Sequence, residues 1–180
     1  FTVVAPVNGT FDKDALLEMV QTAQGDSVVE KSFVQNHLSR SLSSVTKEDK
    51  RVLLLNMKYA EYADGMIEGV TITSPNQRAR NGVLHVAASQ IPYERNLYET
   101  LRDDELLSGI GAVLHRYDED YFDADNSISS GIVEGVPVYV DSVIIERDRM
   151  LDRLGYINRE DSLYWVVAPT KDAWQQVWEE

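Results

Sequence analysis

Apolar residues near the start of the chain first form a short run and then follow a helical period. Residues 1–5 are mostly apolar and end at a proline, which predicts a short buried strand. Apolar side chains then recur three or four residues apart in 12–25 and again in 27–41, which predicts two helices. Because glycine often ends a helix, we expect the first of them to stop at Gly25.

From residue 51 onward the apolar positions alternate instead. Alternation in 51–72 and an apolar run in 83–87 predict strands, and the segment SPNQRARNG at 74–82 predicts the turn between them. Helical spacing returns in 97–101 and 108–117. Helices and strands thus occur in separate blocks along the sequence.

The last third of the chain is less regular. The acidic stretch 118–126 has no clear period and predicts a loop, whereas the alternation in 134–145 predicts a strand or one arm of a hairpin. A short helix is expected to end at Gly155, followed by an apolar strand in 163–168 and a helix from 171. Since the helices are segregated from strands that look antiparallel, the pattern favours an α+β fold.

One phrase occurs twice, near the two ends of the chain. VVAP, four residues and then an aromatic residue occupy 3–11 and again 166–174, with an offset of 163 residues. An offset of this size is typical of a repeated domain rather than of a solenoid repeat. The phrase predicts a buried strand that is closed by proline, a capped helix, and an aromatic side chain one turn into that helix.

These residues resemble the two signatures of the fasciclin (FAS1) domain family. FTVVAPVNGTF at 1–11 is similar to the first signature, and NGVLHV at 81–86 is similar to the second. The family often has a Tyr-His pair between them, and here Asn36 replaces the tyrosine before His37. The signature positions, for which the resemblance implies structural roles, are Pro6, Phe11, His37, Asn81, Gly82, His85, Pro169 and Trp174.

The resemblance implies a fasciclin-like β-wedge of short strands flanked by helices. Residues 1–95 would form one such domain without its leading helices, and 96–180 the first part of a second, with an insertion at about 118–162. Asn81-Gly82 would form a tight turn with positive φ. The helices in 96–117, or the strand 163–168, would then complete the first domain, within one chain or between two.

Charge and cysteine content exclude several function classes. Seventeen basic and thirty acidic residues give a net charge of −13, and no basic stripe is present, so nucleic acid is not an expected partner. The absence of cysteine excludes disulfides, thiolate catalysis and zinc sites built from cysteine. No apolar run is long enough to predict a membrane span in this fragment.

Candidate chemistry is sparse. His37 and His85 are expected to be buried, hydrogen-bonded core residues rather than metal ligands. An EF-hand-like spacing of acidic and serine residues begins at Asp123 and ends at Glu134, but Ile128 stands where the loop needs glycine, so we expect a solvated acidic loop. No nucleophile elbow or phosphate-binding glycine loop occurs. We therefore expect no catalytic residues, no metal and no cofactor.

The resemblance implies a non-enzymatic adhesion or protein-binding module of a tandem-repeat surface protein. It also implies an extracytoplasmic location, as a lipid-anchored outer-membrane protein if the source is bacterial, and self-association is possible. The alternative is a carbohydrate-capture accessory protein at a bacterial surface, with tyrosines stacking on sugar rings. The tyrosines considered for that role are Tyr59, Tyr62, Tyr93, Tyr121 and Tyr139. Coplanar aromatic rings in a groove would favour sugar, and a flat apolar patch would favour protein.

Overall fold

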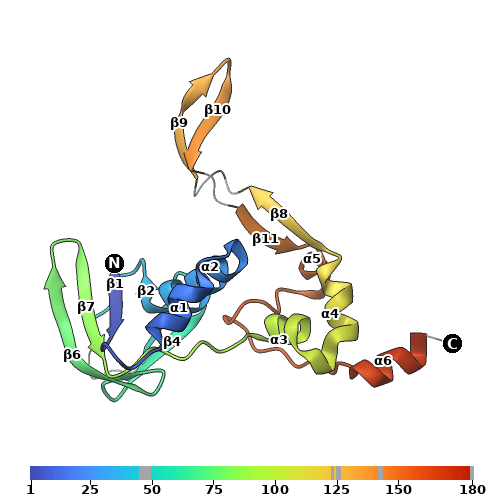
Figure 1. Cartoon of the computed structure of the whole chain (residues 1–180), viewed down its shortest axis with the longest axis horizontal. Helices are drawn as coiled ribbons and strands as arrows, with labels where there is room; N and C mark the ends of the chain where they lie inside the picture. Colours follow the sequence, from blue (N-terminus) through green and yellow to red (C-terminus); the bar gives the residue numbers. More distant parts are fainter. Residues whose placement is uncertain (45–49, 123, 125–126, 142–143, 179–180) are drawn as a thin grey trace. The chain divides into compact units, whose positions relative to one another are not determined.

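The computed structural model describes residues 1–44, 50–122, 124, 127–141 and 144–178, and it has an α+β fold (Figure 1). The chain forms two compact units. Unit 1 comprises Phe1–Glu94 and Arg159–Asp161, and unit 2 comprises Arg95–Asn158 and Ser162–Glu180. Among the described residues, no helix has the length and apolar character needed to cross a membrane.

Unit 1 is built on a seven-stranded sheet in the order β2-β1-β7-β6-β5-β4-β3. The strands are β1 (Thr2–Pro6), β2 (Leu38–Ser39), β3 (Lys50–Leu53), β4 (Tyr59–Ala63), β5 (Met66–Ile67), β6 (Val70–Ala79) and β7 (Gly82–Ala87). The pairings from β3 through β7 are antiparallel, as expected for strands that follow one another along the chain.

Strand β1 holds the first copy of the repeated phrase in the interior of this sheet. It pairs parallel with β7, with Val4 opposite His85, and antiparallel with β2. Thr2 and Val4 are buried, and Val4 belongs to the main apolar cluster of unit 1. Pro6 ends the strand because it has no N–H to give to a ladder.

Two short helices follow β1 and correct one prediction. Helix α1 (Lys13–Met19) begins after Asp12, and α2 (Ala23–Val29) begins after Thr22. The Thr22 hydroxyl accepts a hydrogen bond from the N–H of Gly25 at 3.0 Å, so Gly25 lies in the first turn of α2 and does not end a helix. A π-helical turn over Glu30–Val34 and a 3₁₀ turn over Gln35–His37 continue from α2.

The turn expected across 74–82 is much shorter than predicted. Strand β6 runs on to Ala79, which pairs with Gly82, and its register with β7 shifts twice near Ser74 and Gln77. Asn76 lies inside this irregular region with φ of 57°. Pro75 and Asn76 are typical of turns, but here they occupy irregular positions within a strand.

Unit 2 has its own small apolar core. Its helices are α3 (Leu97–Asp103), α4 (Ser108–His115), α5 (Leu151–Leu154) and α6 (Lys171–Trp178), with a 3₁₀ turn over Glu105–Leu107. Asn96 and Glu99 form a capping box at the start of α3. The buried cluster comprises Tyr98, Leu101, Leu114, Leu151 and Ile157.

The strands of unit 2 form two separate antiparallel ribbons. One pairs β8 (Asp118–Phe122) with β11 (Ile144–Asp148), and the other is the hairpin of β9 (Ile128–Val133) and β10 (Val136–Asp141). The prediction of a loop over 118–126 is therefore wrong for 118–122. Sheet pairing with β11 holds these acidic residues in a strand despite their poor strand propensity.

The calcium spacing falls partly outside the described residues. Asp123 and Asp125 are not described, whereas Glu134 lies in the turn of the β9–β10 hairpin with φ of 52°. Residues 128–134 thus form an arm and turn of a hairpin.

The second copy of the phrase does not form the strand that the sequence predicts. Residues 163–170 belong to no helix or strand, and α6 follows directly. The helices in 97–115 pack around the apolar core of unit 2. Our expectation that these helices or 163–168 complete the first domain, within one chain or between two, stays a prediction.

Candidate functional site

The two signature histidines of unit 1 are buried and hydrogen-bonded on both ring nitrogens. Nε2 of His37 lies 2.8 Å from the N–H of Ile91 and accepts its hydrogen bond, so Nδ1 carries the proton and donates to the Phe33 carbonyl at 2.6 Å. Burial lowers the pKa of the His37 imidazole, against the opposing effect of the Phe33 carbonyl. The ring is held neutral and connects two distant segments of unit 1.

His85 has the opposite tautomer. Its Nδ1 accepts a hydrogen bond from the N–H of Asn76 at 3.0 Å, and its Nε2 donates to the Ser43 carbonyl at 2.8 Å. Burial lowers the pKa of this ring, the Ser43 carbonyl opposes that effect, and Lys50 adds a smaller lowering. Among the described residues, no cluster of three histidine or acidic side chains could hold a metal ion.

The remaining signature residues of unit 1 also pack. The Phe11 ring lies 5.1 Å from that of Phe33. The positive φ predicted at Asn81-Gly82 is wrong, since neither residue has one. Gly82 is required for a different reason. The start of β7 lies so close to the backbone of Phe1 that a Cβ at Gly82 would collide with the Phe1 carbonyl oxygen.

The corresponding residues of the second phrase lie in unit 2. Trp174 is on α6 and packs against Gly109 of α4, where a Cβ would overlap the indole ring. Pro169 precedes this helix, and Ala168 packs at the margin of the unit 2 core. The two sets of signature residues therefore belong to different units.

The candidate tyrosines do not form a coplanar platform. Tyr62 is buried, and burial raises its pKa to about 12. Tyr59 and Tyr93 are partly buried and lie beside Arg51 and Lys58 respectively. Tyr139 meets Phe122 edge-on, with ring planes at 74°, so this pair offers no flat surface to a sugar ring.

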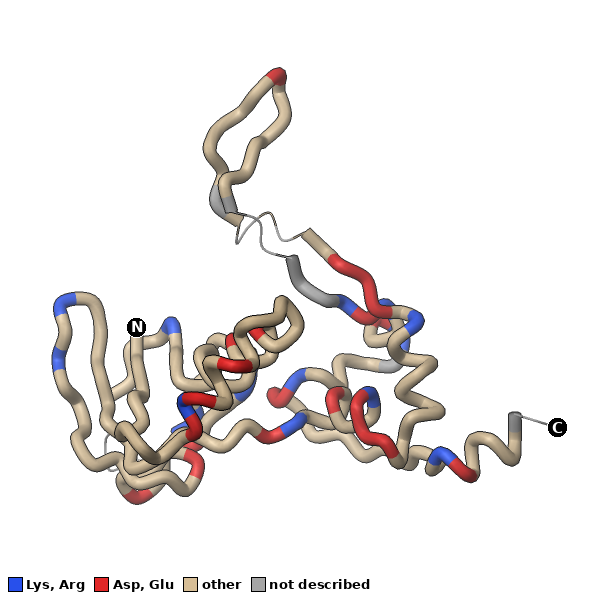
Figure 2. The backbone as a smooth tube through the Cα atoms, in the orientation of Figure 1, with Lys and Arg blue, Asp and Glu red and all other residues tan. Residues whose placement is uncertain are grey.

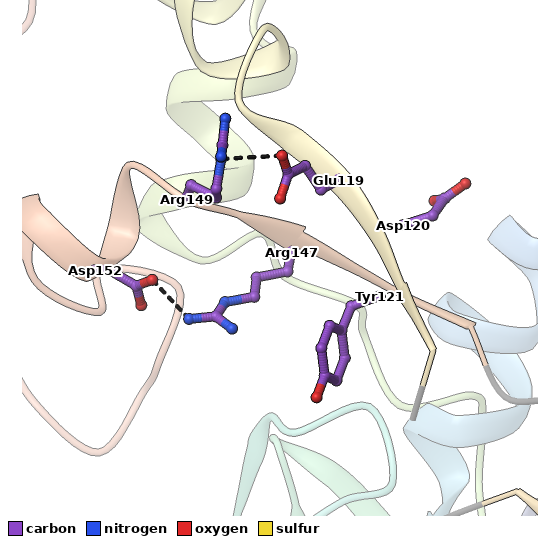
Figure 3. A pocket seen from close by; sticks show the side chains of 6 residues that line it. All are labelled: Glu119, Asp120, Tyr121, Arg147, Arg149 and Asp152. Atoms are coloured by element: carbon purple, nitrogen blue, oxygen red, sulfur yellow. Dashed lines mark hydrogen bonds and ion pairs between the residues drawn. The ribbon is translucent and has the colours of Figure 1, made fainter. Parts of the chain in front are cut away.

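A small polar pocket lies beside the β8–β11 ribbon (Figure 3). It has a volume of about 150 Å³ and is lined by Glu119, Asp120, Tyr121, Arg147, Arg149 and Asp152. Arg147 pairs with Asp152 at 2.6 Å, and Arg149 pairs with Glu119 at 3.0 Å. The Tyr121 ring is exposed beside these charges, which gives the pocket one aromatic surface and several hydrogen-bonding groups.

The β8–β11 ribbon is anchored on its other face. The hydroxyl of Tyr98 lies 3.0 Å from a carboxylate oxygen of Asp118 and 3.0 Å from one of Asp148. Burial and these two carboxylates raise the pKa of Tyr98, which keeps its hydroxyl protonated. This contact connects α3 to both strands that carry the pocket.

The β9–β10 hairpin displays a large uncovered apolar surface. Ile132, Val133, Val136 and Val140 each leave 61–73% of their surface exposed. Between residues 128 and 140 the only charged residue is Glu134, at the turn, and Figure 2 shows the hairpin without any basic segment. Such a concentration of exposed branched apolar residues makes the hairpin a candidate contact surface.

The second phrase adds another exposed apolar stretch. Leu163, Trp165 and Val167 are 75–102% exposed, while Tyr164 and Val166 between them are less so. The alternation is that of an extended chain, with Tyr164 and Val166 on the less exposed side.

The sequence did not reveal these surfaces. The valines of 133–140 and the residues of 163–167 have the pattern of buried strands, and only the structure shows that these side chains are exposed. Of the pocket residues, the sequence analysis named only Tyr121. The consecutive acidic residues 118–120 and the alternating arginines at 147 and 149 could have indicated two strands of opposite charge that pair.

Comparisons of the chain with protein-family models, with curated proteins and with solved structures gave no match. The fasciclin resemblance is thus a prediction that these comparisons neither support nor contradict.

Proposed function

We propose that this chain is a non-enzymatic protein-binding module that contacts its partner through the β9–β10 hairpin. The observation that carries the proposal is the uncovered apolar surface of Ile132, Val133, Val136 and Val140. A two-stranded ribbon is marginally stable alone in water, so contact with another surface would stabilise it. The exposed Leu163, Trp165 and Val167 supply a second apolar contact region.

The fasciclin resemblance supports adhesion as the purpose of this binding. The buried signature residues of unit 1 are consistent with a module whose signatures build the fold while other segments bind. An extracytoplasmic, surface-anchored location belongs to the same proposal and rests on the resemblance alone.

A second candidate, carbohydrate binding, is favoured by the pocket of Figure 3. Tyr121 offers one ring face, and the paired side chains of Glu119, Arg147, Arg149 and Asp152 offer hydrogen bonds to sugar hydroxyls. Its volume of about 150 Å³ is smaller than ordinary ligand pockets, so it would hold one small ring rather than a chain.

Two variants separate these candidates. In the first, residues 128–140 are replaced by a Gly-Ser linker, and in the second Tyr121 is replaced by alanine. The immobilised chain is tested by surface plasmon resonance against purified extracellular-matrix proteins and polysaccharides. We expect saturable binding to a protein that the linker variant loses and Tyr121→Ala keeps. Glycan binding that Tyr121→Ala loses and the linker variant keeps would overturn the proposal in favour of carbohydrate capture.

A further inference from the structure

A three-residue segment from late in the chain belongs to unit 1. Apart from Arg159–Asp161, this unit consists of residues 1–94, and the sequence neighbours of the segment on both sides belong to unit 2. Within unit 1, Glu160 contacts β3, the start of β4 and the turn that joins them. Unit 1 therefore holds this segment as it would hold a short bound peptide.

The Glu160 carboxylate is bound through both of its oxygens. The Lys58 ammonium lies 3.2 Å from Oε1, and the Tyr59 N–H donates to Oε2 at 2.9 Å. The guanidinium of Arg51 donates to the Glu160 carbonyl oxygen at 3.0 Å. The side chain and the backbone of one glutamate are thus recognised together, by two cations and one main-chain donor.

Aromatic rings support both cations. Nζ of Lys58 lies 4.9 Å from the centre of the Tyr93 ring, and the guanidinium carbon of Arg51 lies 4.4 Å from that of Tyr59. Lys58 is 6% exposed, and lysine is rarely buried to this degree without a charged partner. The Glu160 side chain is 25% exposed, so the carboxylate lies at the open side of the site.

The backbone around Lys58 is fixed by residues other than Glu160. The N–H of Lys58 donates to Oδ1 of Asn56 at 3.2 Å, and its carbonyl accepts from the N–H of Leu54 at 2.8 Å. The side-chain amide of Asn56 donates in turn to Oδ1 of Asn36 at 2.9 Å. Because these contacts do not involve the carboxylate, we expect Lys58 and the Tyr59 N–H to keep their positions when Glu160 is removed.

From these contacts we infer that unit 1 has a binding site for a glutamate-containing peptide, formed by Arg51, Lys58 and Tyr59, and that Glu160 of the same chain occupies it. The site makes no use of the β9–β10 hairpin, so this inference goes beyond the proposed function and does not depend on it. A ligand carried on the same chain has a high effective concentration. We therefore expect a separate acidic peptide to enter only when Glu160 is removed.

A rescue experiment in the full chain tests the inference. Glu160→Ala removes the carboxylate, and the probe is the acetylated and amidated peptide NREDS, which has the sequence of residues 158–162. Nuclear magnetic resonance of nitrogen-labelled protein follows the Tyr59 amide, whose proton signal should lie downfield while it donates to a carboxylate. We expect the signal to move upfield in the variant and to return as peptide is added, with a dissociation constant on the order of 1 mM.

The controls separate recognition of the carboxylate from unspecific effects. Asp161→Ala removes the adjacent, exposed carboxylate, and we expect it to leave the Tyr59 signal at its wild-type position. The peptide NRQDS should bind Glu160→Ala at least tenfold more weakly than NREDS does. The wild-type chain should also bind NREDS at least tenfold more weakly, because Glu160 competes for the site. Adding Lys58→Met to Glu160→Ala should abolish the binding of NREDS.

Circular dichroism shows whether the variants fold. Should Glu160→Ala not fold, Glu160→Gln replaces it, since glutamine keeps the size of the side chain without its charge, and the same order of affinities is expected.

Three results would overturn the inference. An unchanged Tyr59 signal in Glu160→Ala would show that the carboxylate is not bound there. No recovery of the signal at about 10 mM NREDS would show that the contact is an internal ion pair and not a peptide site. Equal binding of NREDS and NRQDS would show that the site does not recognise a carboxylate.

Discussion

The same four residues, VVAP, have opposite environments in the two units. In the first copy Val4 is 2% exposed and lies in β1, a strand that pairs with β7 and with β2, whereas its counterpart Val167 is 75% exposed and belongs to no strand. Thr2 is fully buried in the first copy, and Trp165 stands at the equivalent position of the second. The same short sequence can form a strand, but whether it does so depends on the partner strands that are available to pair with it.

The two copies of the phrase also differ in the role that we infer for their surroundings. In unit 1 the phrase contributes to the core, and the nearby polar groups of His37 and His85 are satisfied by backbone partners. In unit 2 the phrase and the β9–β10 hairpin leave apolar side chains in solvent. We therefore infer that the first region stabilises the fold, and we propose that the second contacts other molecules.

The largest expected difference in stability between the two copies comes from making the same substitution, valine to aspartate, in each of them. Val4→Asp places a carboxylate among apolar side chains, and we expect it to lower the free energy of unfolding of unit 1 by about 4 kcal/mol or more. Val167→Asp changes an exposed site, with an expected effect within about 0.5 kcal/mol. Urea unfolding followed by far-ultraviolet circular dichroism measures both. Equal costs would contradict the contrast between the copies.

Acid should destabilise unit 1 more than unit 2. Folding lowers the pKa values of His37 and His85, so their neutral rings favour the folded state above the unfolded pKa of about 6.5. That stability is lost as pH falls below about 6.5, because the unfolded chain then binds protons that the folded chain does not. The loss is at most about 1.4 kcal/mol per pH unit for each histidine.

Unit 2 supplies the control for this titration. Its one histidine, His115, is exposed, and its Nδ1 lies 3.0 Å from a carboxylate oxygen of Asp118. All three tryptophans, Trp165, Trp174 and Trp178, are in unit 2, and their fluorescence reports on that unit. Thermal unfolding is measured at pH 7.5 and at pH 5. We expect the lower pH to reduce the unfolding midpoint seen by circular dichroism more than the midpoint seen by tryptophan fluorescence. Equal shifts would argue against the histidine account.

The smallest expected effect concerns the aromatic residue of the second phrase. Gly109→Ala places a methyl group where the Trp174 ring now lies. Because this methyl group would also meet Cβ and Cγ of Trp174, rotating the ring does not relieve the clash and α6 has to shift, so we expect a loss of about 1 kcal/mol together with a red-shifted tryptophan emission. Gly111→Ala is the comparison, since its Cβ would meet the Arg102 carbonyl of the backbone, which cannot move aside as easily. A larger cost at Gly109 would show that α6 is docked more firmly than we infer.

The sequence predicted the α+β class and most helices, because their apolar spacing is regular in 97–101 and 108–117. It failed where pairing overrides local preference: β6 continues through Pro75 and Asn76, and acidic residues form β8. The opposite error occurred at 163–168, where the apolar pattern predicted a strand and the structure has none. The hairpin surface could not be predicted for the same reason, since exposed valines and buried valines give the same pattern.

The contrast between the two copies is tested most directly by native-state hydrogen exchange, read by mass spectrometry on peptides covering 2–6 and 163–169. The ladder of β1 with β2 and β7 predicts slow exchange in 2–6, close to the slowest in unit 1. The absence of a ladder predicts that 163–169 exchanges orders of magnitude faster, near the rate of an unstructured peptide. Equal protection of the two segments in dilute, monomeric protein would contradict the account.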